Sequence, residues 1–210
     1  MILPYTNPKI ILEGKIAIVG SSSNLIGKNL GKEIDSYPNV VRFNRAPTDG
    51  FTQDVGEKTT LRVVNQHVFS GESEYPKERE QTQPPNFIRD QKNMGIVYMG
   101  PHLAEWNKRE TCIDPSSTPY LVDYNPACSW FNEKIAKNIG NNARPTVGML
   151  FISLCICSGV KPDVYGFGVN EGTNITHYWE DRENTSSCHN YTAEREIILS
   201  LEREGKIVLH

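Results

Sequence analysis

The sequence lacks a long hydrophobic run. Its longest nearly apolar stretch, residues 149–157, is nine residues long and is interrupted by Ser153, whereas a helix that crosses a bilayer needs about 20 apolar residues. The first residues, MILPYTNPKIILEG, contain two prolines and no basic residue ahead of the apolar ones, which is not typical of a signal peptide. The sequence therefore predicts a soluble chain with no integral membrane segment.

Basic charge is also in short supply. Lys and Arg total 22 against 25 Asp and Glu, and the formal net charge is -3. Proteins that bind nucleic-acid phosphates through bulk charge carry a positive excess, so no nucleic acid is expected as a partner, although a local basic site stays open. With 210 residues and about 150 per domain as a guide, we expect one domain over residues 1–210.

Cysteines are few and odd in number. The chain has five, and Cys155 and Cys157 lie within the apolar stretch, which favours buried thiols over a framework of disulfides. Such thiols predict a reducing compartment, the cytoplasm. A zinc site that adds Cys188 and His189 to this pair is disfavoured, because C-x-C within an apolar helix does not match the paired spacings of zinc ligands. We therefore expect no metal and no bound cofactor.

What the sequence does contain is an alternation of strand and helix patterns. Seven short β-branched runs, separated by turn signals, predict strands at residues 15–20, 39–44, 59–65, 95–100, 118–123, 163–168 and 206–210. Helical patterns fall between several of them, at residues 27–34, 128–137, 147–158 and 191–204. Asn190 and Gly205 are the expected N-cap and left-handed stop of the last helix. This alternation is typical of an α/β, Rossmann-like fold with helices on both faces of a mostly parallel sheet.

The first predicted strand runs into a loop of small polar residues, GSSSNLIGKNLG. A strand, a small-residue turn and a helix N-terminus together favour an anion, because free N–H groups and the helix dipole converge there. Gly20 and Gly27 are seven positions apart, wider than in a Walker A loop, and Asn29 follows Lys28 where Ser or Thr would bind magnesium. No G-x-G-x-x-G occurs there, which disfavours an enzyme using NAD or S-adenosylmethionine. The alternative is a tight turn that binds nothing.

Two histidines in the last third of the chain are accompanied by carboxylates. His177 precedes Glu180, and His189 precedes Glu194. Imidazole is the usual general base near neutral pH, so either ring could act on a substrate. The alternative for each one is a surface histidine that caps or packs.

Together these motifs resemble the sialyltransferases of glycosyltransferase family 29, which carry four sialylmotifs in a fixed order. The core of the large motif, R-x-N-x-A-P-T-x-G-F-x-x-D-V-G, includes Arg42 and Asn44. The segments that resemble the large, small, third and very small motifs are residues 16–60, 144–168, 177–180 and 189–194. Residues 66–143 correspond to the family's variable region, which shapes the acceptor side.

The resemblance implies a fold and a reaction. The fold would be the family's variant of the GT-A fold, a single Rossmann-like domain. The reaction would be inverting, metal-independent transfer of sialic acid, or of a related ulosonic acid such as Kdo, from its CMP donor to the hydroxyl of a glycan acceptor. The sequence contains no Asp-x-Asp, the motif by which glycosyltransferases usually hold a divalent metal against a nucleotide diphosphate.

The resemblance also implies roles for individual residues. The catalytic residues would be His189, as the general base, and His177, which would contact the donor phosphate. Donor binding would involve Ser21, Ser22, Asn44, Thr146, Gly148 and Gly168, and the supporting residues would be Glu194 and Tyr178.

The chain departs from the family pattern in three places. Ser21 stands where the family has a nucleotide-binding asparagine, and Val147 replaces the second hydroxyl of the small motif. These changes support an alternative, a CMP-sugar- or glycan-binding relative with weak or no catalysis, although retention of both histidines and Glu194 weighs against it. The linking disulfide of animal members would need cysteines at Ile16 and Gly159.

The origin of the chain is also inferred from absences. It lacks the anchor and stem of the animal enzymes, and the sequons at Asn174, Asn184 and Asn190 lie among the catalytic motifs, where glycosylation sites are interpreted as coincidence. We expect a microbial, viral or algal member in the cytoplasm, with an excised catalytic domain as the alternative. The polar stretch 70–93 predicts a surface excursion, mobile or a lid. Neither the acceptor nor the oligomeric state follows from the sequence.

Overall fold

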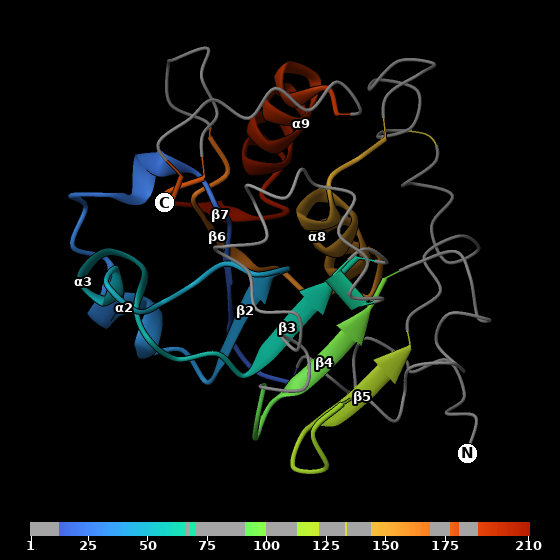
Figure 1. Cartoon of the computed structure of the whole chain (residues 1–210). Helices are drawn as coiled ribbons and strands as arrows, with labels where there is room; N and C mark the ends of the chain where they lie inside the picture. The colour runs from blue at the N-terminus through green and yellow to red at the C-terminus, as the bar shows by residue number, and fades with distance from the viewer. Residues whose placement is uncertain are drawn as a thin grey trace.

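A seven-stranded parallel sheet forms the centre of the protein (Figure 1). The computed structural model describes residues 13–65, 68–69, 91–99, 113–121, 133, 144–168, 177–180 and 189–210. The strand order is β5-β4-β3-β2-β1-β6-β7, and each neighbouring pair is parallel. The strands are β1 Ile16–Val19, β2 Asn39–Phe43, β3 Leu61–Val64, β4 Gly95–Tyr98, β5 Thr118–Leu121, β6 Asp163–Tyr165 and β7 Val208–Leu209. The prediction of an α/β sheet with about seven mostly parallel strands is confirmed.

The order of the strands reverses beside β1. From β1 the chain builds outward through β2 to β5 on one side, and then returns to place β6 and β7 on the other. In open parallel sheets, ligands bind outside the carboxyl ends of the strands at such a switch point. The loop of small polar residues follows β1. The small motif ends in Tyr-Gly-Phe-Gly, residues 165–168, which begins at the end of β6. The switch point therefore brings two of the predicted motifs to one edge of the sheet.

Two long helices cover one face of the sheet. The helices α8 (Val147–Cys157) and α9 (Tyr191–Arg203) share one hydrophobic cluster with the inner residues of β1, β2 and β3 (Figure 1). Eight of the 11 residues of α8 are buried. A helix surrounded by protein needs no polar face, which agrees with the almost wholly apolar sequence of α8. Among the described residues, no helix is both long and apolar enough to span a membrane. Both helices confirm the predictions made for these segments.

The ends of α9 also agree with the sequence. The side-chain oxygen of Asn190 accepts a hydrogen bond from the N–H of Ala193 at 3.1 Å, which caps the helix. Gly205 adopts a φ of 67° just beyond the helix, a conformation that glycine adopts without a steric penalty. The asparagine of one predicted sequon thus has a structural role.

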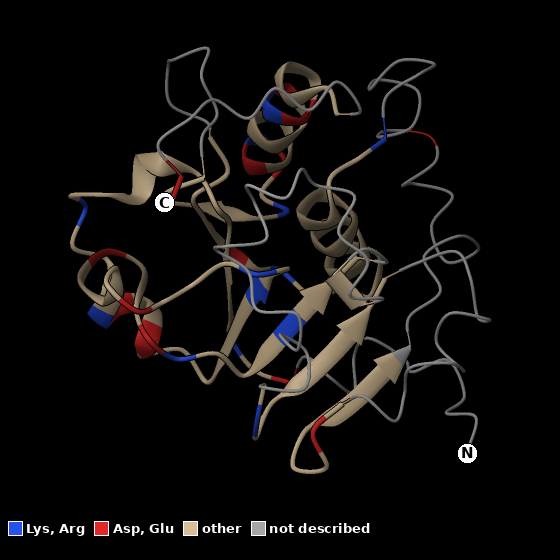
Figure 2. Cartoon of the chain, in the orientation of Figure 1, with Lys and Arg blue, Asp and Glu red and all other residues tan. Residues whose placement is uncertain are grey.

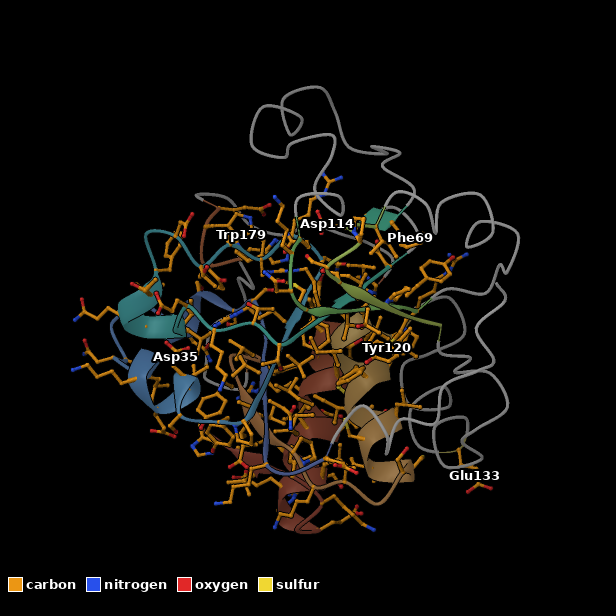
Figure 3. All side chains as sticks on the ribbon, turned by 90° about the horizontal axis from the view of Figure 1, so that it is seen from below. Asp35, Phe69, Asp114, Tyr120, Glu133 and Trp179 are labelled. Atoms are coloured by element: carbon orange, nitrogen blue, oxygen red, sulfur yellow. The ribbon has the colours of Figure 1, made fainter. Side chains whose placement is uncertain are left out.

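The opposite face carries short helices. They are η1 (Ser23–Leu25), α2 (Gly31–Asp35) and α3 (Thr52–Val55). Figure 3 shows Asp35 at the end of α2, where its carboxylate accepts hydrogen bonds from the N–H groups of Glu57 at 3.0 Å and Lys58 at 2.9 Å. This carboxylate fixes α2 against the chain that leaves α3.

Some predicted boundaries differ from the structure. The helix predicted at 27–34 begins only at Gly31, because Gly27 and Asn29 have left-handed φ angles of 81° and 57° that interrupt a right-handed helix. The single turns η1 and α3 were not predicted, since they are too short to show helical periodicity. The helix predicted at 128–137 and the excursion at 70–93 lie almost wholly outside the described residues.

The cysteine prediction is partly wrong. Cys155 is a free, buried thiol, and burial raises its pKa well above the ordinary range. Cys157, however, is disulfide-bonded. The apolar stretch favoured thiols because α8 is buried, but Cys157 lies in the last turn of the helix, where the exposure of the chain increases and a second cysteine can approach.

We expect Gly20→Ala to destabilise the switch point. A Cβ atom at Gly20 would lie 2.3 Å from the carbonyl oxygen of Gly166 and 2.9 Å from the Phe167 ring. Because the first neighbour is backbone, β1 and β6 would have to separate, at a cost of about 1–3 kcal/mol in the free energy of unfolding. Chemical denaturation measures this change.

Gly205→Ala is the control for this variant. No atom lies within 4 Å of a Cβ built there, so only backbone strain of about 1 kcal/mol is expected. A Gly20→Ala protein as stable as the unaltered chain would show that the strands tolerate the added methyl group.

Candidate active site

Three segments that are distant in sequence meet beyond the carboxyl end of β1. The N–H of Gly20 donates to the carbonyl of Tyr165 at 2.7 Å, and that of Ser22 donates to Gly166 at 3.0 Å. On the other side, Ser22 forms an antiparallel bridge with His177. The large, small and third motifs are therefore joined through the loop after β1, which places the candidate residues Ser21, Ser22 and His177 together.

Gly148 and Gly168, both predicted to bind the donor, lie at the start of α8 and just after β6. A Cβ at Gly148 would lie 2.7 Å from the ring of Phe167, so the first turn of α8 approaches the Tyr-Gly-Phe-Gly segment closely. Gly168, at the end of this segment, has a φ of 62°. The absence of a side chain at Gly148 keeps the start of α8 close to the end of β6.

The side chain of His177 is oriented by its own segment. Its Nδ1 lies 3.1 Å from a carboxylate oxygen of Glu180, and its ring stacks on Trp179 with centroids 4.5 Å apart and planes 1° apart. One third of the His177 side chain is exposed, against 15% for Glu180. The ring is thus held in place, while part of it faces solvent.

Tyr178 anchors this segment to the large motif. It is 7% exposed, its hydroxyl donates to the carbonyl of Pro47, and its ring makes an edge contact with Phe51. Burial raises the pKa of Tyr178 to about 12, so the phenol stays neutral and acts as a donor. Through these contacts Tyr178 holds the third motif against the large motif.

The side-chain amide of Asn44 is oriented by a hydrogen bond to its oxygen. The residue has a left-handed φ of 46°, and its Oδ1 accepts a hydrogen bond from the N–H of Asn65 at 3.0 Å. Because the oxygen is engaged, Nδ2 is the end that is left to donate to a ligand. This geometry suits a residue that binds an anionic or carbonyl oxygen.

Two buried arginines support the backbone of the large motif, Arg62 around Asn44 and Arg42 at the end of α3, and the sequence interpretation gave neither a role of this kind. Figure 2 shows basic positions on the neighbouring strands β2 and β3, where Arg42 and Arg62 are register partners. The Nη1 of Arg62 donates to the carbonyls of Asn44 at 3.0 Å and Ala46 at 3.1 Å. Burial, and then the charge of Arg42, lower the pKa of Arg62 to about 10, so it is a cation at neutral pH. A basic residue inside a β-branched run was the signal that could have indicated this role.

The very small motif is fastened to the start of α8. Thr146 caps α8 by accepting from the N–H of Met149 at 3.2 Å. The carboxylate of Glu194 accepts from the N–H of Thr146 at 2.6 Å and from its hydroxyl at 2.7 Å. His189 uses Nδ1 to reach the carbonyl of Arg144 at 2.6 Å. The predicted residues Thr146, His189 and Glu194 therefore form one connected group.

Burial of Glu194 predicts a pH-dependent stability. Its pKa rises from 4.5 to about 7 because of burial, although the hydrogen bonds from Thr146 oppose the rise. The folded state then holds a proton that the unfolded state releases, so its contribution to stability is complete below pH 4.5 and is lost as pH rises through about 7. We expect this loss to be roughly 3 kcal/mol.

Glu194→Gln should remove this slope from the free energy of unfolding between pH 4.5 and 7, because glutamine does not titrate. Chemical denaturation at several pH values measures it. The control Glu202→Gln, at an exposed position on α9, should leave the slope unchanged. An identical slope in both variants would show that Glu194 does not titrate across this range.

Within the part of the chain that the structure describes, no three His, Cys, Asp or Glu side chains are grouped as a metal site requires. Cys188 of the disfavoured zinc set lies outside that part. Independence from metal stays a prediction.

Residues 14–206 match the sequence profile of glycosyltransferase family 29 (sialyltransferase). The chain belongs to glycosyltransferase family 29. Among family members, CMP-N-acetylneuraminate-beta-galactosamide-alpha-2,3-sialyltransferase 2 of Mus musculus is 32% identical over 93% of this chain and 56% of its own length. Beta-galactoside alpha-2,6-sialyltransferase 1 of the same species is 30% identical over 83% of this chain and 45% of its own length. The chain thus spans about half the length of these relatives.

The fold agrees with family membership. The crystal structure of a mammalian sialyltransferase in complex with Gal-beta-1-3GalNAc-ortho-nitrophenol superposes with a TM-score of 0.68 over 96% of this chain and 71% of that one, at 23% identity. The Rossmann-like α/β fold expected from the sialylmotifs is therefore confirmed.

The predicted origin is wrong. Relatives at about 30% identity come from animals, mouse and human among them, so a microbial, viral or algal source is not indicated. The cytoplasmic prediction relied on unpaired cysteines, whereas Cys157 is disulfide-bonded. It also relied on a missing anchor, which carries no weight in a chain that spans 56% of the mouse alpha-2,3 relative.

Proposed function

We propose that this chain transfers sialic acid from CMP-sialic acid to a glycan hydroxyl, with inversion and without a metal ion. Sequence relatives named as sialyltransferases, covering 93% of this chain, support the donor and the class of reaction. CMP-Kdo is the second donor to be tested. Because the relatives are named for beta-galactosides and beta-galactosamides, we propose a galactose-type acceptor; both 2,3 and 2,6 linkages occur among them.

The observation that carries this proposal is the orientation of His189. A carbonyl oxygen only accepts hydrogen bonds, so the contact with Arg144 at 2.6 Å requires the proton on Nδ1. In the neutral imidazole the lone pair is then on Nε2, the atom that a general base needs.

The proposed reaction proceeds in one displacement. The acceptor oxygen forms a bond to the anomeric carbon as its proton passes to Nε2 of His189. The bond from that carbon to the phosphate oxygen breaks on the opposite face, and its electron pair stays on CMP. His177 and Nδ2 of Asn44 would stabilise the donor phosphate, in keeping with the role of donors directed at developing charge.

The first test is CMP release from CMP-sialic acid and from CMP-Kdo, with and without a mixture of galactose-terminated glycans, and with EDTA in a parallel series. We expect release that depends on the acceptor and is unchanged by EDTA. No release above the spontaneous rate with any donor would contradict the proposed transfer, and loss of release in EDTA would contradict its independence from metal.

The alternative function is CMP-sugar binding without turnover. Val147, which replaces a hydroxyl of the family pattern, packs against the main hydrophobic cluster, and its aliphatic side chain offers no hydrogen bond to a CMP-sugar. Calorimetry with CMP, together with the CMP-release assay, separates the alternatives. CMP binding without CMP release supports a binding protein, whereas CMP binding with acceptor-dependent release supports the enzyme.

A further inference from the structure

The two histidines of the site use the same ring nitrogen in different ways. Nδ1 of His189 faces the neutral carbonyl of Arg144, whereas Nδ1 of His177 faces the carboxylate of Glu180 at 3.1 Å. Hydrogen bonds to ionised groups are about twice as strong as those between neutral groups. The two rings are therefore placed in electrostatically different environments, as acid and base partners in one site usually are.

Glu180 is built into the segment that carries His177. The N–H of Glu180 donates to the carbonyl of His177 at 3.0 Å, which closes a turn and directs the carboxylate toward the ring. Trp179 stacks on the ring, and the backbone of His177 is bridged to Ser22. The ring has little freedom to rotate, so Nε2 keeps one direction.

We infer that Glu180 is a positioning residue that makes His177 a hydrogen-bond donor to the leaving phosphate, whereas His189 accepts a proton as the base. The inference rests on the proposed function and deepens it. The carboxylate holds a proton on Nδ1 and stabilises the ring when a second proton is present on Nε2. The Nε2–H then donates to the phosphate of the donor as the bond to the sugar breaks, while the lone pair on Nε2 of His189 takes the acceptor's proton.

Two substitutions separate the charge of Glu180 from its orienting effect. Glu180→Gln keeps an oxygen that accepts from Nδ1 but removes the negative charge, so we expect kcat to fall about 5- to 10-fold with little change in the donor KM. Glu180→Ala removes both, so the donor KM should also rise, by about 10-fold. Glu202→Gln, at an exposed position on α9, is the control and should change neither constant.

A double-mutant cycle shows whether Glu180 acts through His177. In a His177→Ala background, both Glu180 substitutions should change kcat and KM by less than about twofold. Equal effects with and without the His177 imidazole would overturn the inference, because Glu180 would then act on the donor or the fold by another route.

The tautomer gives a readout that does not depend on turnover. In protein labelled with 15N-histidine, the signals of His177 are those lost in His177→Ala. We expect the Nδ1-protonated pattern in the unaltered chain and in Glu180→Gln, and a mixture of tautomers in Glu180→Ala. An unchanged pattern in Glu180→Ala would overturn the inference. If the unaltered chain releases no CMP, the proposed function fails, and these spectra still decide whether Glu180 positions the ring.

Discussion

Replacing His189 with alanine should lower the rate of sugar transfer by about 10²–10⁴-fold and leave CMP binding nearly unchanged. The variant removes the nitrogen that takes the acceptor's proton, but the groups assigned to the donor, His177 and Asn44, stay in place. Transfer and CMP affinity are measured separately, by release of CMP with saturating acceptor and by calorimetry.

The structure indicates that this variant should fold. The His189 side chain contributes one hydrogen bond, to the carbonyl of Arg144, while the attachment of the very small motif to α8 depends on the two contacts between Glu194 and Thr146. A loss of activity should therefore occur without loss of the folded state, which circular dichroism and the denaturation midpoint can verify.

His210 offers a matched control. It stacks on Tyr165 and bonds to Asp163, the first residue of β6, so its substitution by alanine should leave kcat unchanged. A His189→Ala protein with full transfer activity would eliminate this residue as the base. Equal losses in the two variants would show that the effect is structural.

Replacing Arg42 with methionine should lower the free energy of unfolding by about 3–5 kcal/mol. Arg42 is fully buried, and its Nη2 donates to the carbonyls of Val55 at 2.6 Å and Gly56 at 3.1 Å, at the end of α3. Its Nε reaches the carbonyl of Lys58 and the hydroxyl of Thr59 at 3.2 and 3.1 Å. Methionine fills much of the volume but leaves all four acceptors without this donor.

The loss is large because two of these acceptors, the carbonyls of Val55 and Gly56, lie inside the protein. A buried acceptor that loses its partner costs about 1–3 kcal/mol, and domains of this kind are stabilised by about 5–15 kcal/mol in total. Burial lowers the pKa of Arg42, and the guanidinium is retained through its hydrogen bonds to backbone carbonyls.

Chemical denaturation tests this expectation, with Arg203→Met as the control. Arg203 is exposed in the last turn of α9, where a cation contributes at most about 1 kcal/mol through the helix dipole. A loss below 1 kcal/mol for Arg42→Met would show that water or a rearranged α3 satisfies the carbonyls.

Local chemistry explains why much of the fold was predictable. The seven strands were identified because each is a short β-branched run bounded by turn residues, and the limits of α9 followed from Asn190 and Gly205, which act within a few residues of themselves. The motifs also indicated the candidate site residues, and two of them follow β1 and β6, whose carboxyl ends lie at one edge because the strands are parallel.

The sequence by itself thus determined the α/β class, the family and the set of candidate residues. Only the tertiary structure decided how those residues act: Nδ1 of His189 is engaged by a carbonyl 45 residues away, and Glu194 binds Thr146 across 48 residues. Burial of Arg42 and Arg62 and the disulfide of Cys157 were likewise decided there. The physical reason is separation along the sequence. Helix and strand propensities and caps act over a few residues, whereas these contacts form only once the sheet and its helices have packed.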